Sequence, residues 1–294
     1  MIPKLVIHGG AGSALEGEKS PDAVRSSLAA IVSEVYGALA DGLAATAAVV
    51  MACRLLEDDP LFNAGTGSVL QSDGQVRMSA SVMDGQRQSF SGVINVSRVQ
   101  HPITMAAHLQ TSPDRVVSDL GAAELARELT LPIYDPITPK RLREWVELQQ
   151  QKVTELPQRV RTSLAMGTVG AVALDVQGSL AAATSTGGRG FERIGRVSDS
   201  ATPAGNYATA SAAVSCTGVG EDILDEGVAT RIVVRVTDGL TLTEAVAKTF
   251  AEAKGRQRDF GAIAVSATGE IAWDTTTDLI LVAAHDGHTI HLSL

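Results

Sequence analysis

The order of the predicted elements indicates a layered α+β protein. Strand and helix signals come in the order strands, helices, linker, strands, helices, which is typical of that class. The 294 residues are enough for one large domain or two small ones, and 45% hydrophobic residues supply a substantial core. Because only 3% of the residues are aromatic, small and β-branched side chains must fill this core. We therefore expect tightly packed layers.

Charge and composition restrict the classes of partner. A net charge of -9 argues against binding to a nucleic-acid backbone and is compatible with a small zwitterionic substrate. The N-terminus lacks the apolar core of a signal peptide, and no run reaches the ~18 apolar residues of a membrane span. We expect a cytoplasmic protein without a membrane partner. Cys53 and Cys216 are too isolated for a disulfide framework or a zinc site, so both are expected to be core thiols.

A short buried strand, residues 5–7, is expected to run into the glycine loop that begins at His8. His8 is either catalytic or a hydrogen-bonded core residue, and the second is more common for a lone histidine after an apolar strand. The segment from Gly12 to Ser20 resembles a phosphate cradle, but Glu18 stands where lysine must directly follow the second glycine. We interpret this nucleotide-binding signal as a chance match.

Two helices follow. Residues 20–22 supply an N-cap, a proline and an early acid, and helical spacing of apolar residues continues to Gly42. Residues 46–56 are nearly all apolar and predict a buried helix that stops at the acidic segment 57–60. The loop 61–67 comes next. Acids beside such a loop could hold a cation, but from spacing alone a solvated helix end is the more common arrangement.

The middle of the chain predicts a meandering antiparallel sheet and two short helices. The strands are expected at residues 69–70, 76–82 and 90–96, with a turn at 73–74, and the helices at 102–109 and 120–129. Residues 132–166 carry prolines and many charges, and we expect a mobile linker there. Residues 142–153 contain helix formers, but little of this part is apolar enough to dock.

The C-terminal part predicts an outer layer of helices and further strands. Residues 212–216 read as a strand, 222–236 and 243–253 as helices, and the remainder as strands ending in a hairpin at Asp286 and Gly287. His285, His288 and His291 follow closely on one another. On a strand, His288 faces opposite to the other two, so the three cannot converge on a metal.

The junction of Gly167 and Thr168 carries a candidate nucleophile. A threonine hydroxyl needs a base beside it, and a cut before Thr168 would free the residue's own amine, which titrates near pH ~7.7 to 8.0. Gly167 tolerates the close approach that attack on its carbonyl requires. By itself the segment from Gly167 to Gly170 is more often a glycine-flanked strand start.

Counting across a hairpin brings a second hydroxyl to Thr168. The apolar runs 169–174 and 180–183 are joined by a loop in which Gly178 suits the left-handed position. If Asp175 pairs with Ser179, Thr168 lies opposite Thr186, with Cβ atoms about 5 Å apart. The second hydroxyl could hydrogen-bond to Thr168 or to an acyl-enzyme, although Thr-Thr pairs also occur simply as sheet stabilisers.

Two further groups suit a zwitterionic substrate. After Gly187 and Gly188, a loop carries Arg196 and Asp199, which could clamp a carboxylate and an ammonium group respectively. Without context they form a surface ion pair. The segment 217–221 places glycine amides at the start of a helix, where they suit an oxyanion.

Together these segments resemble the plant-type asparaginases, or isoaspartyl peptidases, which are N-terminal-nucleophile hydrolases. The resemblance covers nearly the whole chain and is specific because its motifs come in one order. The motifs are His8 to Gly12, Leu56 to Gly65, Met83 to Gly85, Gly167 to Leu174, Ala182 to Gly188, Gly195 to Ser200, and Ser215 to Glu221.

The resemblance implies an αββα four-layer sandwich that cuts itself before Thr168. The parts 1–167, which ends in the linker, and 168–294 would stay together as one domain, and the cleaved units would dimerise. The substrate would be an isoaspartyl dipeptide or L-asparagine. The roles implied are nucleophile and base for Thr168, assistance for Thr186, support for Asn63, substrate binding for Arg196 and Asp199, and the oxyanion hole for Thr217 and Gly218.

The resemblance implies no organic cofactor. It does imply a structural sodium ion at the loop after the second helix, where spacing alone favours a solvated helix end. Its ligands would be the carbonyls of Leu56, Glu57, Asp59, Phe62, Ala64 and Thr66. The chain departs from the family pattern at Met166, Ser198, Ala201 and Ala262, and the last three are expected at the pocket wall. The departures at Met166 and Ser198 motivate an alternative, an uncleaved and catalytically weak homologue that binds an aspartyl-like ligand.

Overall fold

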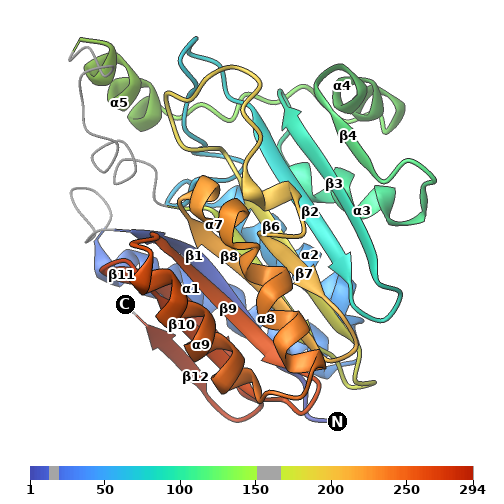
Figure 1. The fold of residues 1–294 in the computed structure, drawn as a ribbon. Helices are drawn as coiled ribbons and strands as arrows, with labels where there is room; N and C mark the ends of the chain where they lie inside the picture. The colour runs from blue at the N-terminus through green and yellow to red at the C-terminus, as the bar shows by residue number, and fades with distance from the viewer. Residues whose placement is uncertain (13–19, 151–166, 294) are drawn as a thin grey trace.

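The computed structural model describes residues 1–12, 20–150 and 167–293, and contains two β-sheets with helices packed against them (Figure 1). The mixed α+β class predicted from the sequence is confirmed. The larger sheet has the strand order β12-β11-β1-β5-β6-β2-β3-β4 and the smaller β10-β9-β8-β7. The strands of the larger sheet are β1 (Lys4–Gly12), β2 (Met78–Asp84), β3 (Ser89–Val96), β4 (Val116–Ser118), β5 (Val169–Leu174), β6 (Leu180–Thr186), β11 (Leu279–His285) and β12 (Ile290–Ser293). Those of the smaller sheet are β7 (Asn206–Ala208), β8 (Ala212–Gly218), β9 (Phe260–Ser266) and β10 (Ile271–Thr275).

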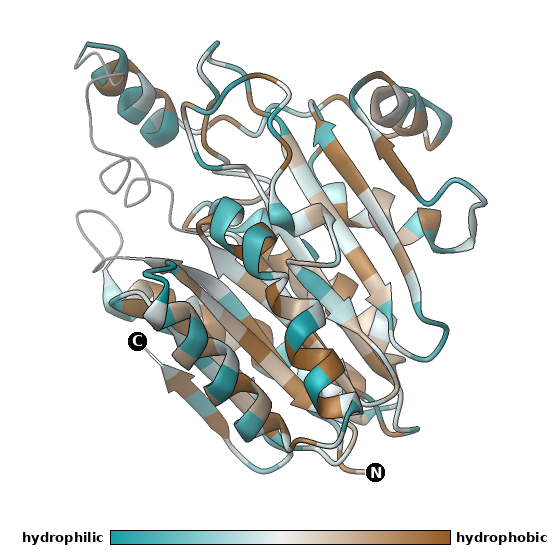
Figure 2. Ribbon diagram, in the orientation of Figure 1, coloured by the Kyte–Doolittle hydropathy of each residue, from teal (hydrophilic) through white to brown (hydrophobic). Residues whose placement is uncertain are grey.

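Apolar side chains fill three clusters. One lies between the helices α1 and α2 and one face of the larger sheet, a second between β8, β9 and the helices α8 and α9, and a third between the two sheets. Figure 2 shows hydrophilic residues on the outward faces of α8 and α9. The α-helices are α1 (Pro21–Ala40), α2 (Ala45–Asp58), α3 (Pro102–His108), α4 (Asp119–Glu128), α5 (Pro139–Gln150), α7 (Gly220–Glu226), α8 (Val228–Thr237) and α9 (Leu242–Gly255).

Helix α1 begins where the sequence predicts. The Ser20 side chain accepts a hydrogen bond from the backbone of Ala23, and Pro21 occupies the first turn. By length and composition alone α1 could cross a membrane. However, Val24, Leu28 and Val32 on one face of it are fully buried in the first cluster, which is the pattern of a core helix.

The expected meander is wrong. Strand β2 pairs with β3, but its other neighbour is β6, which lies about a hundred residues further along the chain. Residues 69–70 form no strand, because their backbone groups bond to loops. The Val69 amide donates to Asn63 Oδ1 at 2.9 Å, and the Leu70 carbonyl accepts from Phe191 at 2.9 Å.

The helix expected over residues 222–236 is interrupted. Gly227, with φ of 56°, ends α7 in the left-handed conformation, and α8 starts at Val228. The C-terminal hairpin forms as predicted between β11 and β12. Its histidines have separate partners, since His285 stacks on Tyr36 and His291 pairs with Asp286.

Helix α5 lies within the expected linker, and its apolar Leu142 and Val146 are exposed, as the expectation that little of the segment docks requires. Polar and aromatic side chains nevertheless reach the body of the protein. The buried Arg141 donates from Nε to the Gly67 carbonyl at 2.7 Å. Trp145 donates to the Gln71 carbonyl at 2.9 Å and stacks on Phe191 with ring centroids 6.0 Å apart. Two long side chains therefore help to anchor a helix of which Arg141 is the buried residue. Residues 151–166 and the cradle-like residues 13–19 lie outside the described part of the chain.

Candidate active site

The hairpin of β5 and β6 has the register predicted by counting. Val169 pairs with Ser185, and the Asp175 amide donates to the Ser179 carbonyl at 3.0 Å. One step beyond the paired strand, Thr168 Oγ1 lies 2.9 Å from Thr186 Oγ1. The two hydroxyls are therefore hydrogen-bonded to each other, as expected.

His8 lies beneath the nucleophile candidate as a neutral, fully buried ring. Burial lowers the pKa of His8 to about 3. The hydrogen bond with the Thr168 carbonyl acts in the opposite direction, but its effect is smaller. Because that carbonyl can only accept, Nδ1 carries the proton and donates to it at 3.0 Å. Nε2 then accepts from Ser215 Oγ at 2.9 Å, and Thr184 lies 2.7 Å from the same hydroxyl. The hydrogen-bonded interpretation of His8 is confirmed, and its bond fixes the backbone of Thr168.

The carbonyl of Gly167 is polarised by a backbone donor. The Asn63 amide donates to it at 2.9 Å. Gly167 has φ of 135°, and a Cβ there would lie 2.7 Å from the nitrogen of Asn63, so this approach requires glycine. The Asn63 side chain donates to the Gly188 carbonyl at 2.7 Å and accepts from Val69, which holds its backbone in place. Such a donor stabilises negative charge on an attacked carbonyl oxygen.

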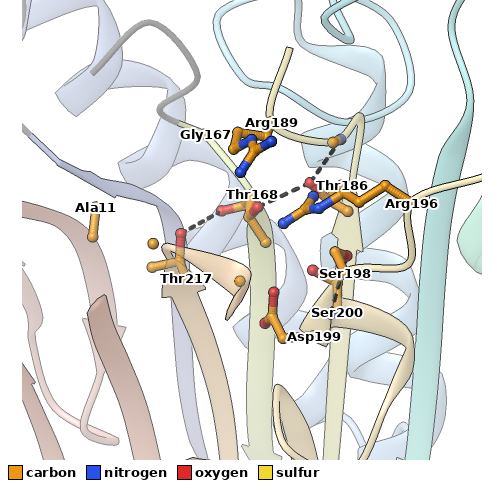
Figure 3. Close-up of a pocket in the computed structure, with 13 residues that line it drawn as sticks. Ala11, Gly167, Thr168, Thr186, Arg189, Arg196, Ser198, Asp199, Ser200 and Thr217 are labelled. Carbon is orange, nitrogen blue, oxygen red and sulfur yellow. Dashed lines mark hydrogen bonds between the residues drawn. The ribbon is translucent and has the colours of Figure 1, made fainter. Parts of the chain in front are cut away.

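A pocket opens over Thr168 and collects most of the predicted site residues (Figure 3). Asn63 does not line it but is hydrogen-bonded through its amide to the carbonyl of Gly167, which does. The lining residues are Ala11, Gly167, Thr168, Thr186, Gly188, Arg189, Arg196, Ser198, Asp199, Ser200, Thr217, Gly218 and Gly220.

Asp199 is a buried acceptor with spare capacity. Its side chain is 4% exposed, and Oδ2 has no hydrogen-bond partner within the described ranges. Burial raises the pKa of Asp199 to about 7, and the charge of Arg196 opposes that rise. The ionised, unpartnered carboxylate of Asp199 would be stabilised by a hydrogen bond from an ammonium group that enters the pocket.

Arg196 is held by a carboxylate that the sequence-based prediction missed. Its Nε and Nη2 donate to the two carboxylate oxygens of Glu221 at 3.1 and 2.9 Å. Burial raises the pKa of Glu221, but the hydrogen bond and charge of Arg196 outweigh it and keep the pKa below its usual value. This two-point pair orients the planar guanidinium beside the pocket and leaves Nη1 for a further acceptor. The only signal in the sequence was the acid at the start of α7.

Thr217 and Gly218 end strand β8 at the same pocket. The Thr217 hydroxyl donates to the Thr168 carbonyl at 3.4 Å. Of the three departures expected at the wall, Ser198 lines the pocket, but Ala201 and Ala262 do not. Ala262 instead packs in the second apolar cluster, because its side chain points from β9 toward the helices. The expectation for these two alanines is therefore wrong.

Glu57, at the end of α2, is a fully buried acid below Thr186. Its Oε1 accepts from Ser185 Oγ at 2.6 Å and from the Ile103 amide at 3.1 Å, while Oε2 has no partner among the described residues. Burial raises the pKa of Glu57 to about 8 against these hydrogen bonds, so the acid is neutral at pH 7. It ties helix α2 to the strand that carries Thr186.

The loop after α2 folds back on itself. The Thr66 amide donates to the Glu57 carbonyl at 2.7 Å, and the Phe62 amide to the Asp59 carbonyl at 3.1 Å. Gly65 crosses so close that a Cβ there would overlap the Glu57 carbonyl oxygen. The carbonyl oxygens of Glu57 and Asp59 each accept one of these hydrogen bonds and keep a second lone pair, which could bind a cation.

The paired threonine hydroxyls and the charged side chains of the pocket are groups that suit amide hydrolysis, and comparison with known proteins identifies the chain as a hydrolase. The family model described as asparaginase matches residues 1–293, and the chain belongs to this family. It is 60% identical to the isoaspartyl peptidase/L-asparaginase of Nostoc sp., over 98% of this chain and 93% of that protein. The identity is 56% to the protein of the same name from Synechocystis sp., over 99% of this chain and 90% of that protein. The identity to the isoaspartyl peptidase/L-asparaginase of Homo sapiens is 37%, over 98% of this chain and 94% of that protein.

Proposed function

We propose that the protein hydrolyses β-aspartyl amide bonds in isoaspartyl dipeptides and L-asparagine. The observation that carries this function is the 2.9 Å contact between the hydroxyls of Thr168 and Thr186, in a pocket that also contains Arg196 and Asp199. The arginine and the buried carboxylate match the α-carboxylate and α-ammonium of an aspartyl group.

The activation step is cleavage of the bond before Thr168. The hydroxyl of Thr168 attacks the Gly167 carbonyl, whose oxygen accepts from the Asn63 amide. The C–N bond between Gly167 and Thr168 then breaks, the hydroxyl proton passes to the departing amine of Thr168, and water hydrolyses the resulting ester. The products are the parts 1–167, ending in the linker 132–166, and 168–294, and the second part begins with a free amine. We further propose that these parts remain one domain of αββα four-layer type, that cleaved units dimerise, and that the protein is cytoplasmic. The three apolar clusters support the layers.

In the mature enzyme, the free amine of Thr168 accepts the proton from Oγ1, which attacks the side-chain carbonyl of the substrate. Thr186 donates a hydrogen bond to Oγ1 and so stabilises it as it loses the proton. The Thr217 hydroxyl and the Gly218 amide stabilise the oxyanion. The protonated amine gives its proton to the leaving nitrogen, and water then releases aspartate from the ester.

A sodium ion would stabilise the loop after α2. The fold-back onto the Glu57 carbonyl suits an oxygen cage, and the ion would hold the loop that carries Asn63 without entering the reaction. The ligands would be the carbonyls of Leu56, Glu57, Asp59, Phe62, Ala64 and Thr66.

Mass spectrometry of the purified protein tests the function together with an assay of aspartate release. We expect a fragment that begins at Thr168 and turnover of both substrates. Thr168→Ala should abolish cleavage and turnover, while Thr168→Ser, which keeps a hydroxyl, should retain some of each. An intact chain that binds aspartate in a calorimeter but releases no product would instead indicate the non-cleaving binding protein.

A further inference from the structure

A second arginine lines the pocket. Arg189 directly follows Gly188 and contacts the same cavity as Thr168 and Arg196. Its Nη1 lies 3.4 Å from Glu221, a long contact compared with the two bonds of Arg196. Its Nε is buried and has no hydrogen-bond partner in the ranges that the structure describes. The guanidinium therefore has donors that Glu221 does not satisfy.

The loop that carries Arg189 is anchored. Its amide donates to Glu192 Oε1 at 3.3 Å, and Glu192 is 2% exposed. Phe191 stacks on Trp145 of α5. An arginine on an anchored loop binds a carboxylate at a lower entropic cost than one on a free loop.

The charges of the aspartyl group do not account for this arginine. That group offers one carboxylate and one ammonium, which Arg196 and Asp199 match. L-Asparagine contains nothing more, because its leaving group is ammonia. An isoaspartyl dipeptide has one more anion, the α-carboxylate of the residue that leaves. Figure 3 shows Arg189 on the opposite side of Thr168 from Asp199, toward Gly167.

We propose that Arg189 binds the free carboxylate of the leaving residue and so makes the enzyme prefer isoaspartyl dipeptides to L-asparagine. This proposal rests on the proposed function. Arg189 is then a determinant of specificity that contacts the leaving half of the substrate, and Arg196 remains the partner of the aspartyl half.

The test compares kcat/KM for three substrates that share the aspartyl group: β-aspartyl-leucine, β-aspartyl-leucinamide and L-asparagine. The amide differs from the dipeptide only in its carboxylate. In Arg189→Met, we expect the ratio of dipeptide to amide to fall about tenfold or more, because a charge-assisted hydrogen bond is lost. Arg189→Lys should recover part of the ratio. Arg193→Gln removes an exposed arginine of the same loop and should leave the ratio at its wild-type value.

Two results would overturn the proposal. If Arg189→Met lowers kcat/KM equally for all three substrates, the residue only supports Arg196 through Glu221. If it lowers none, the carboxylate binds elsewhere. Both results require wild-type turnover and so leave the proposed function intact, whereas a wild-type protein that cleaves none of the substrates would refute the proposed function and this proposal together.

Discussion

Replacing Glu57 with glutamine should remove a pH dependence of the stability. Burial raises the pKa of this acid to about 8 in the folded protein, from an ordinary value of 4.5. Between these values the folded state binds a proton that the unfolded state has released. The stabilisation is therefore fully present below the ordinary pKa and is lost as the pH rises through the folded pKa.

The magnitude follows from linkage. In this range the unfolding free energy falls by about 1.4 kcal/mol for each pH unit, so between pH 5 and pH 8 the loss is about 4 kcal/mol. Glutamine has the same shape and can accept the bonds from Ser185 and Ile103, but it does not titrate. Between pH 5 and pH 8 the unfolding free energy of the wild type should therefore fall by about 4 kcal/mol more than that of Glu57→Gln.

Urea denaturation followed by circular dichroism at pH 5, 6, 7 and 8 measures this difference. Glu34→Gln, which changes an exposed acid on α1, is the matched control and should follow the wild type. If the curves of unfolding free energy against pH for wild type and Glu57→Gln run parallel, Glu57 is ionised in the folded protein and the reasoning is refuted.

Three other outcomes are expected. Asn63→Ala leaves the Gly188 carbonyl and the Val69 amide without their partner. The variant should cleave the bond before Thr168 at least about tenfold more slowly, as measured by gel electrophoresis over time, and cleavage at the wild-type rate would contradict this. Because the pKa of Asp199 is raised to about 7, KM should fall as the pH rises from 6 to 8 and the carboxylate forms; Asp199→Asn should raise KM and flatten this profile. Trp145→Ala should lower Tm by about 4 to 8 °C in calorimetry, since contacts worth about 2 kcal/mol are lost. Trp145→Phe should keep most of the stability. An unchanged Tm for the alanine variant would show that α5 docks without stabilising the fold.

The sequence was most informative where the determining interactions are local. The hairpin register depends on a loop of five residues whose Gly178 has φ of 88°, and it correctly places Thr186 against Thr168. The helix caps are equally local. The order of the strands is not, since β2 pairs with β6 across an intervening stretch of about a hundred residues.

The buried polar contacts were also beyond reach. Nothing near Glu57 in the sequence indicates that Ser185 and Ile103 will enclose it, so an acid at a helix end before proline read as solvated surface. Arg196 and Glu221 are separated by twenty-five residues, and only the tertiary structure makes them a pair. The buried contacts of α5 include Arg141 with the Gly67 carbonyl and Trp145 with Gln71 and Phe191. These partners are distant in the sequence, so the composition of the segment does not reveal them.

The position of β1 between two strands from the other side of residue 167 has a consequence for refolding. Strands β1 to β4 precede residue 167 and β5, β6, β11 and β12 follow it, yet β1 lies between β11 and β5 in one sheet. Once the bond before Thr168 is cut, two separate chains share that sheet. An uncut chain can refold alone at a rate that does not depend on concentration. The cut protein must first find its other half, so its recovery from unfolding becomes second order and it is preserved mainly by a slow rate of unfolding.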